Sequence, residues 1–120
     1  GNSWKGERPV QQDSQFEEFV SMEYGLRAGF KLMRNHITGF RGTRPKMNTI
    51  QKLIGVWAPR TENATDRYVN IVCKRTGYIP NQIIDPTNSG MMIAIAQAMV
   101  YVECGVEIKK EYYQSAWALL

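Results

Sequence analysis

The segment MMIAIAQAMVYV at residues 91–102 constrains the fold more strongly than any other part of the chain. Gln97 is its only strongly polar residue, so a helix over this segment is apolar on nearly all of its faces. Helices of that kind are buried among other helices in globular proteins. The apolar run is shorter than the roughly 18 residues of a membrane-crossing helix, and no signal peptide opens the chain. We therefore expect a central, buried helix in a compact helical domain.

A first helix is predicted before this segment by apolar residues that recur at steps of three and four. They mark one buried face and are Met22, Leu26, Phe30, Met33 and Ile37. Ser21 is the predicted N-cap of this helix and Gly39 its predicted end. Residues 40–47, FRGTRPKM, then form a basic loop.

Three more helices complete the predicted bundle. One follows a cap at Asn48 or Thr49 and stops before Pro59, because the residue before a proline avoids helical angles. The next is capped by Asn63 and closed by Gly77, and the last covers roughly residues 108–118.

The first twenty residues are predicted to be non-helical. Pro9 interrupts them, and QFEEF at residues 15–19 has a short apolar–polar alternation that is typical of a small β-hairpin or an irregular element. The sequence thus predicts a mainly α fold, α+β at most: a single domain over residues 1–120 with about five helices and a small N-terminal β-hairpin or irregular element. The opening Gly1-Asn2 suggests that the chain is trimmed at its N-terminus.

The charge distribution and the cysteine and histidine content restrict the partners and cofactors that we expect. The net charge of +4 is spread over several short groups, mainly Arg41 to Lys46, Lys74-Arg75 and Lys109-Lys110. This scatter makes nucleic acid a disfavoured partner, whereas weak attraction to an anionic wall polymer is compatible with it. The two cysteines are predicted to be buried free thiols, and a single histidine leaves no metal site, so no cofactor is expected.

Glu103 is the main candidate for chemistry, because it ends the most apolar helix. Burial and the negative end of the helix dipole would both favour its protonated form, which a glycosidase uses to protonate a departing sugar oxygen. Alternatively, Glu103 faces solvent and pairs with Lys109 or Lys110, and spacing alone favours this alternative.

A glycosidase usually needs a second carboxylate, and the sequence does not rank the candidates. They are Glu62 and Glu18, which we take as possible helpers, and Asp13, Glu17 and Glu23. The candidate ligand-binding residues lie in loops or at a helix start: Trp4, Tyr78 and Asn63.

Several motifs resemble a family of small phage and prophage proteins that are usually labelled virion or structural proteins. The matching pieces, in order, are WKG at 4–6, FEEFVSMEYGLRA at 16–28, TI at 49–50, WAPRTENAT at 57–65 with Tyr68, Val72 and TG at 76–77, and ECG at 103–105. Family members carry an Asn-Pro-Gly-Asn-Ile stretch before the Trp-Lys-Gly, which implies that this chain is trimmed.

The same opening is similar to the second half of glucosaminidases and lysozyme-like wall hydrolases, whose catalytic Glu ends a buried helix shortly before a Gly. This resemblance implies a lysozyme-like fold with Glu103 as general acid, in a permuted order. Cys104 departs from the pattern, which prefers Asn at this position.

Two main hypotheses follow. In the first, a virion-associated domain binds or hydrolyses peptidoglycan, as a glycoside hydrolase or lytic transglycosylase, with Glu103 as its acid. In the second, the chain is a non-enzymatic virion module that binds other virion proteins. A third, nucleic-acid packaging, requires the clusters at Arg41–Lys46 and Lys74-Arg75 to share one face.

Overall fold

The computed structural model describes residues 14–57 and 61–120, with side chains described from Val20 onward. Five helices follow one another along the chain: α1 (Ser14–Gly42), α2 (Ile50–Trp57), α3 (Glu62–Thr76), α4 (Ser89–Cys104) and α5 (Lys110–Ala118). Within the described residues the β pairing is limited to a single antiparallel bridge between Thr49 and Ile83. The predicted mainly α fold with about five helices is confirmed.

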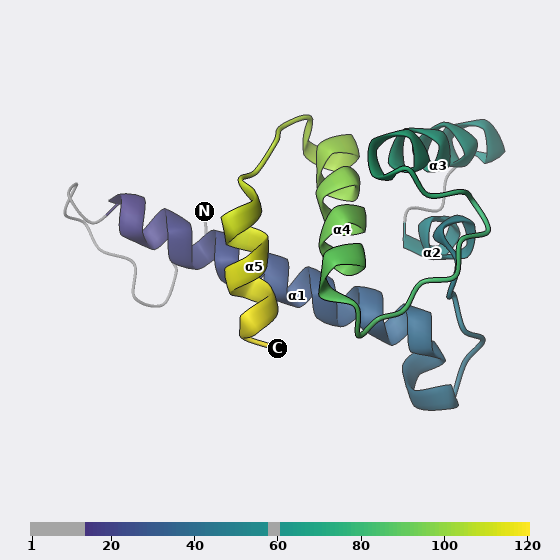
Figure 1. The fold of residues 1–120 in the computed structure, drawn as a ribbon, viewed down its shortest axis with the longest axis horizontal. Coiled ribbons are helices and arrows are strands. Elements are labelled where there is room, and N and C mark those ends of the chain that lie inside the picture. Colours follow the sequence, from purple (N-terminus) through teal and green to yellow (C-terminus); the bar gives the residue numbers. More distant parts are fainter. Residues whose placement is uncertain (1–13, 58–60) are drawn as a thin grey trace.

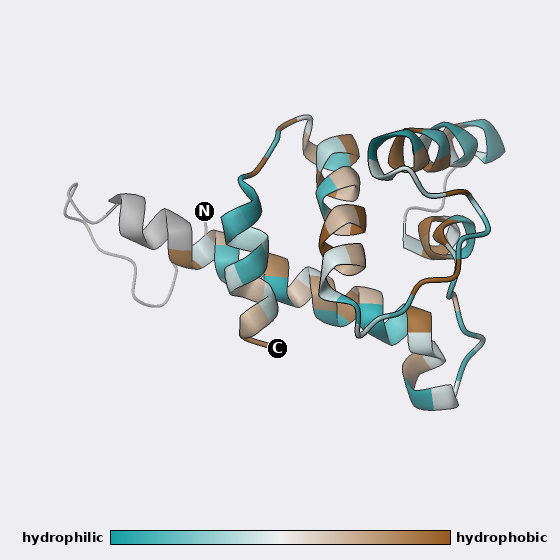
Figure 2. Cartoon of the chain, viewed as in Figure 1, coloured by the Kyte–Doolittle hydropathy of each residue, from teal (hydrophilic) through white to brown (hydrophobic). Residues whose placement is uncertain are grey.

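Helix α4 is the central helix, as its composition predicts. It packs against α3 on one side and α5 on the other, and α1 crosses beneath it (Figure 1). Met92, Ile95 and Met99 are almost completely buried. Figure 2 shows the contrast with α3, whose ribbon is hydrophilic along much of its length. Among the described residues, no helix has the length and hydrophobicity needed to cross a membrane.

Helix α1 packs on α5 through an aromatic cluster. The Phe30 ring meets Trp117 and Tyr113 edge-on, at centroid distances of 5.2 and 6.5 Å. The Arg27 Nε donates a hydrogen bond of 3.1 Å to the Leu119 carbonyl and ties the end of α5 to α1. Tyr113 is fully buried, whereas its neighbour Tyr112 is only half-buried.

The N-terminal prediction is wrong for residues 14–20. They form the first turns of α1, which extend past α5 in Figure 1, instead of a strand or an irregular segment. QFEEF is too short for its alternation to settle the period, and the stretch 14–20 contains neither Gly nor Pro to interrupt a helix. The rest of the predicted hairpin, including Trp4, lies outside the described residues.

The helix caps partly follow the sequence. The Thr49 hydroxyl accepts a hydrogen bond from the Lys52 amide at 3.1 Å, which confirms one of the two predicted caps of α2. Thr61, not Asn63, caps α3, because the Thr61 hydroxyl accepts from the Ala64 amide at 3.2 Å. Asn63 is therefore an exposed residue of the first turn.

Candidate functional site

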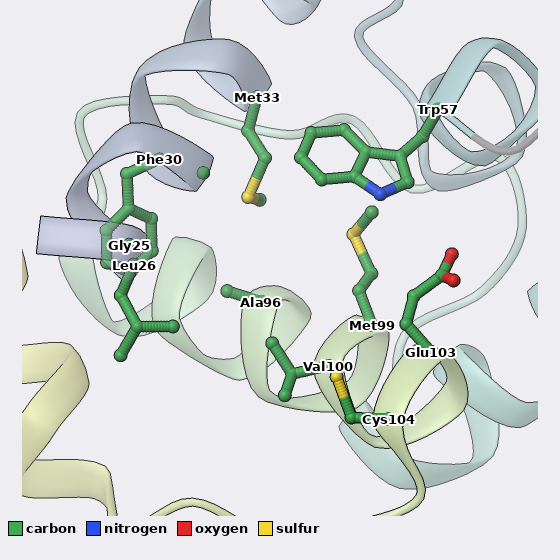
Figure 3. A pocket seen from close by; sticks show the side chains of 11 residues that line it. Gly25, Leu26, Phe30, Met33, Trp57, Ala96, Met99, Val100, Glu103 and Cys104 are labelled. Carbon is green, nitrogen blue, oxygen red and sulfur yellow. The ribbon is translucent and has the colours of Figure 1, made fainter. Parts of the chain in front are cut away.

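An apolar groove of about 190 Å³ lies where α1, the end of α2 and α4 meet (Figure 3). Its residues are, from α1, Gly25, Leu26, Gly29, Phe30 and Met33, with Trp57 from α2 and Ala96, Met99, Val100, Glu103 and Cys104 from α4. The groove is therefore built almost entirely from carbon and sulfur atoms.

The spacing of these residues explains how two helices form the walls. The α4 residues follow one another at steps of three, one, three and one, and the α1 residues at a similar spacing, so each set occupies one helix face. A Cβ atom added at Gly25 or Gly29 would meet no atom within 4 Å. The two glycines thus leave the α1 wall of the groove open.

Glu103 is an exposed residue at the edge of this groove. Figure 3 shows its carboxylate on the Trp57 side, away from Phe30. The last turn of α4 rises out of the core, and Gly105 ends the helix in a left-handed conformation with its amide donating to the Tyr101 carbonyl at 2.8 Å. Glu103 is therefore exposed, which agrees with the solvent-facing alternative that spacing favoured and not with the buried acid of the catalytic hypothesis.

The other predicted catalytic residues are not brought to Glu103. Glu62 is the exposed first residue of α3 and is not part of the groove. Glu18 lies in the first turns of α1, and its side chain is outside the described part of the chain. Of the described residues that line the groove, Glu103 alone carries a carboxylate.

The predicted ligand-binding residues are also dispersed. Asn63 lines a separate hollow of about 290 Å³ beside Arg67, Tyr68 and Val102. Tyr78 lies on the loop after α3, as predicted, and is half-buried against the hydrophobic core. Trp4 lies outside the described residues.

Both cysteines are free, as predicted, but they differ in exposure. Cys73 is half-buried, and burial raises the pKa of its thiol. Cys104 is exposed beside Glu103, in contrast to the expected burial. Among the side chains of residues 20–57 and 61–120, no group of three or more His, Cys, Asp or Glu lies close enough to hold a metal ion.

The basic clusters at Arg41–Lys46 and Lys74-Arg75 lie near opposite ends of α4. Arg75 forms an ion pair with Glu107 and stacks on Tyr101, at 3.8 Å from the ring centroid, near the C-terminal end. Arg41 and Lys46 line a hollow with Pro86, which lies just before the N-terminal end. A helix of this length separates them by about 24 Å. At this separation the two clusters do not form one continuous basic patch.

The hollow that Arg41 and Lys46 share is a feature that motif reasoning missed. We described residues 40–47 only as a basic loop, whereas in the structure residues of this loop line a hollow with a volume of about 440 Å³. The signal in the sequence was the distribution of acids: no Asp or Glu occurs between Glu23 and Glu62.

Comparison with known proteins identifies a phage relative. No protein-family model matches the chain, and no solved structure matches it. A lysozyme-like fold, which the resemblance to wall hydrolases implied, thus gains no support. Over 118 residues the chain is 33% identical to Protein P5 of Pseudoalteromonas phage PM2, in an alignment that covers 93% of this chain and 69% of the phage protein. The chain therefore belongs to the family of Protein P5 of Pseudoalteromonas phage PM2.

Proposed function

We propose that this chain is a non-enzymatic structural and interaction module of a phage particle. Membership in a phage protein family supports the phage context. The exposure of Glu103 is the observation that carries the choice of a module over a hydrolase, because a general acid needs an environment that keeps it protonated.

The groove beside Glu103 also argues for this choice. A glycan-cleaving cleft needs polar groups that bind sugar hydroxyls and a second carboxylate or an equivalent nucleophile. The described lining supplies apolar carbon and sulfur atoms and one exposed carboxylate. Such a surface is suited to contact with other apolar groups, as in an assembly of protein chains.

The decisive experiment compares the hydrolysis of bacterial peptidoglycan by the parent protein and by the Glu103→Gln variant. Purified peptidoglycan is incubated with each protein, with a known lysozyme as the positive control, and turbidity is followed. We expect no clearing by either protein. Clearing by the parent that is lost in a folded Glu103→Gln variant would overturn the proposal and make Glu103 a catalytic acid.

The particle role has its own measurement. Particles produced from the genome that encodes the chain are purified on a density gradient and quantified by mass spectrometry. If the chain is a structural component, we expect each purified particle to contain it at a fixed ratio to the major coat protein. Its absence from intact particles would exclude a structural role.

A further inference from the structure

Positive charge is concentrated in one third of the chain. Residues 24–61 contain eight Lys and Arg residues and no Asp or Glu, whereas the rest of the chain has an excess of acids. In the described part of the chain, the ion pair between Arg75 and Glu107 lies outside this region, and none joins its cations to an acid. All the charged side chains of this region are thus positive.

Two of these cations and one threonine form a row along α1. Lys31 and Arg34 are spaced three residues apart, and Thr38 follows four residues later, so all three share one helix face. At about 100° per residue this face lies roughly opposite the face of Gly25 and Gly29. The row therefore runs along the flank of α1 that is not occupied by the apolar groove.

The row ends at the hollow of about 440 Å³. Thr38 lines this hollow together with Arg41, Lys46, Asn48, Ile37, Gly42, Ile84 and Pro86. Arg41 and Lys46 are exposed, and no described residue of the lining is acidic. The Thr38 hydroxyl donates to the Arg34 carbonyl at 2.9 Å, so the donors left for a ligand come from Arg41, Lys46 and Asn48.

The backbone that holds Arg41 is strained. Phe40 and Arg41 have φ angles of 50° and 61°, in the left-handed region that side chains other than glycine rarely adopt. Contacts fix this turn: the Arg44 guanidinium lies 4.3 Å from the Phe40 ring centroid, and the Arg44 amide donates to the Gly39 carbonyl at 2.9 Å. Strain that neighbouring contacts maintain is concentrated at binding sites in proteins.

We propose that the row and the hollow bind the phosphodiester backbone of a nucleic acid, without selectivity for sequence. Lys31 and Arg34 lie along the right-handed part of α1, and Arg41, in the left-handed turn that follows, lines the concave pocket. This succession of cations matches a linear chain of phosphates. Arg and Lys contacts to phosphates provide binding of this kind through counterion release. A flat anionic membrane would meet a planar cationic surface better than a row that ends in a hollow.

This inference is independent of the proposed structural role. The sequence disfavoured nucleic acid because its positive charge is scattered over several short groups. The surface now proposed takes its cations from α1 and the following loop, and it does not need Lys74 or Arg75.

The test measures fluorescence anisotropy of a labelled 20-base-pair DNA duplex with the whole chain, at salt concentrations from 50 to 200 mM. With four phosphate contacts, from Lys31, Arg34, Arg41 and Lys46, affinity should fall about 150-fold over this range. No binding to the duplex at 50 mM salt by the folded parent would overturn the proposal.

A pair of double variants separates this surface from net charge. Arg41→Gln with Lys46→Gln should reduce the slope of log K against log salt by about 1.8. The control, Lys109→Gln with Lys110→Gln, removes the same charge from exposed residues at the start of α5 and should leave the slope unchanged. Equal effects of the two double variants would overturn the proposal.

Two further arms keep the result interpretable. If the Arg41 and Lys46 double variant loses its helical circular dichroism, Lys31→Gln with Arg34→Gln takes its place, with the same expected slope change. Vesicles with anionic phosphatidylglycerol replace the duplex in a parallel assay. Binding to vesicles with the same variant dependence, and none to DNA, would overturn the proposal in favour of a membrane surface.

Discussion

The two flanks of α1 differ in chemistry although one helix forms both. On one flank, Gly25 and Gly29 form a wall of an apolar groove that α4 and Trp57 complete. On the other, Lys31 and Arg34 form a cationic row that leads to the hollow at Arg41. The core-facing residues Phe30, Met33 and Ile37 lie between the two flanks.

The difference shows which surface depends on tertiary packing. The groove exists only where α1, α2 and α4 meet, so any change in their crossing changes it. The cationic row is a local property of α1, because Lys31 and Arg34 share a face in any helix. Perturbing the common core should therefore destroy the groove first, and single-flank substitutions should leave the other flank intact.

The largest effect is expected from Phe30→Ala, which removes the side chain that both flanks share. Phe30 is 1% exposed and packs on Tyr113 and Trp117, so the free energy of unfolding should fall by about 3–5 kcal/mol. Urea denaturation measures this loss. The control Leu32→Ala, at a residue 43% exposed on the same helix, should cost roughly 0.5 kcal/mol or less. Similar losses in both variants would contradict the proposed packing of α1.

The second effect is a loss of stability at alkaline pH, which tests how α5 covers α1 beside the cationic row. Burial raises the pKa of Tyr113 to about 12, with a smaller contribution from Cys104. The folded state thus favours the neutral phenol, and the stabilisation is complete below the unfolded pKa of about 10 and is lost between pH 10 and 12. The loss should approach about 2–3 kcal/mol.

Tyr113→Phe isolates this contribution, since other tyrosines and lysines also titrate in the range. Urea midpoints of parent and variant are compared at pH 8 and pH 11. The parent should lose more stability than the variant over this interval. Parallel losses would mean that the Tyr113 phenol is accessible to solvent and that α5 is not closed on α1.

Much of the fold could be predicted from residue spacing. The recurrence of apolar residues from Met22 to Ile37 places the core face of α1, and the composition of residues 91–102 places α4 at the centre. Both patterns reflect burial along one helix, which sequence records directly. The start of α1 at Ser14 could not be read, because QFEEF is too short to distinguish a period of two from one of 3.6.

The candidate site was less accessible to prediction. Sequence places Glu103 at a helix end, but its exposure depends on how far the last turn of α4 rises above its neighbours. The left-handed turn at Phe40 and Arg41 runs against the preference of both residues, so local propensity cannot indicate it. The sequence shows that no Asp or Glu follows Glu23 before Glu62, but only the fold shows that Arg41 and Lys46 of this stretch line a hollow.

On the groove flank, Gly29→Ala should raise stability by about 0.5–1 kcal/mol. Glycine in a helix interior is less favourable than alanine by this amount, and the added methyl group meets no atom within 4 Å. Thermal unfolding measures the change. Gly39→Ala is the matched control and should destabilise, because Gly39 has a φ of 69° and its added Cβ would lie 2.2 Å from the Arg44 carbonyl oxygen. A loss of stability in Gly29→Ala would mean that the groove is closed in solution.

The smallest expected effect, on the cationic flank, is a gain of about 0.5 kcal/mol in Arg41→Gly. The left-handed conformation costs a non-glycine residue about 1–2 kcal/mol, and the greater freedom of glycine in the unfolded chain offsets part of this relief. The control Arg34→Gly makes the same exchange within right-handed helix and should lose about 1 kcal/mol. Both variants remove one cation from the proposed surface, so both should weaken binding to the DNA duplex. A variant that is more stable and yet binds less well would show that Arg41 is held in its strained conformation for contact with a ligand. Unchanged duplex binding by Arg41→Gly would instead leave its conformation as a consequence of how the chain turns from α1 toward α2.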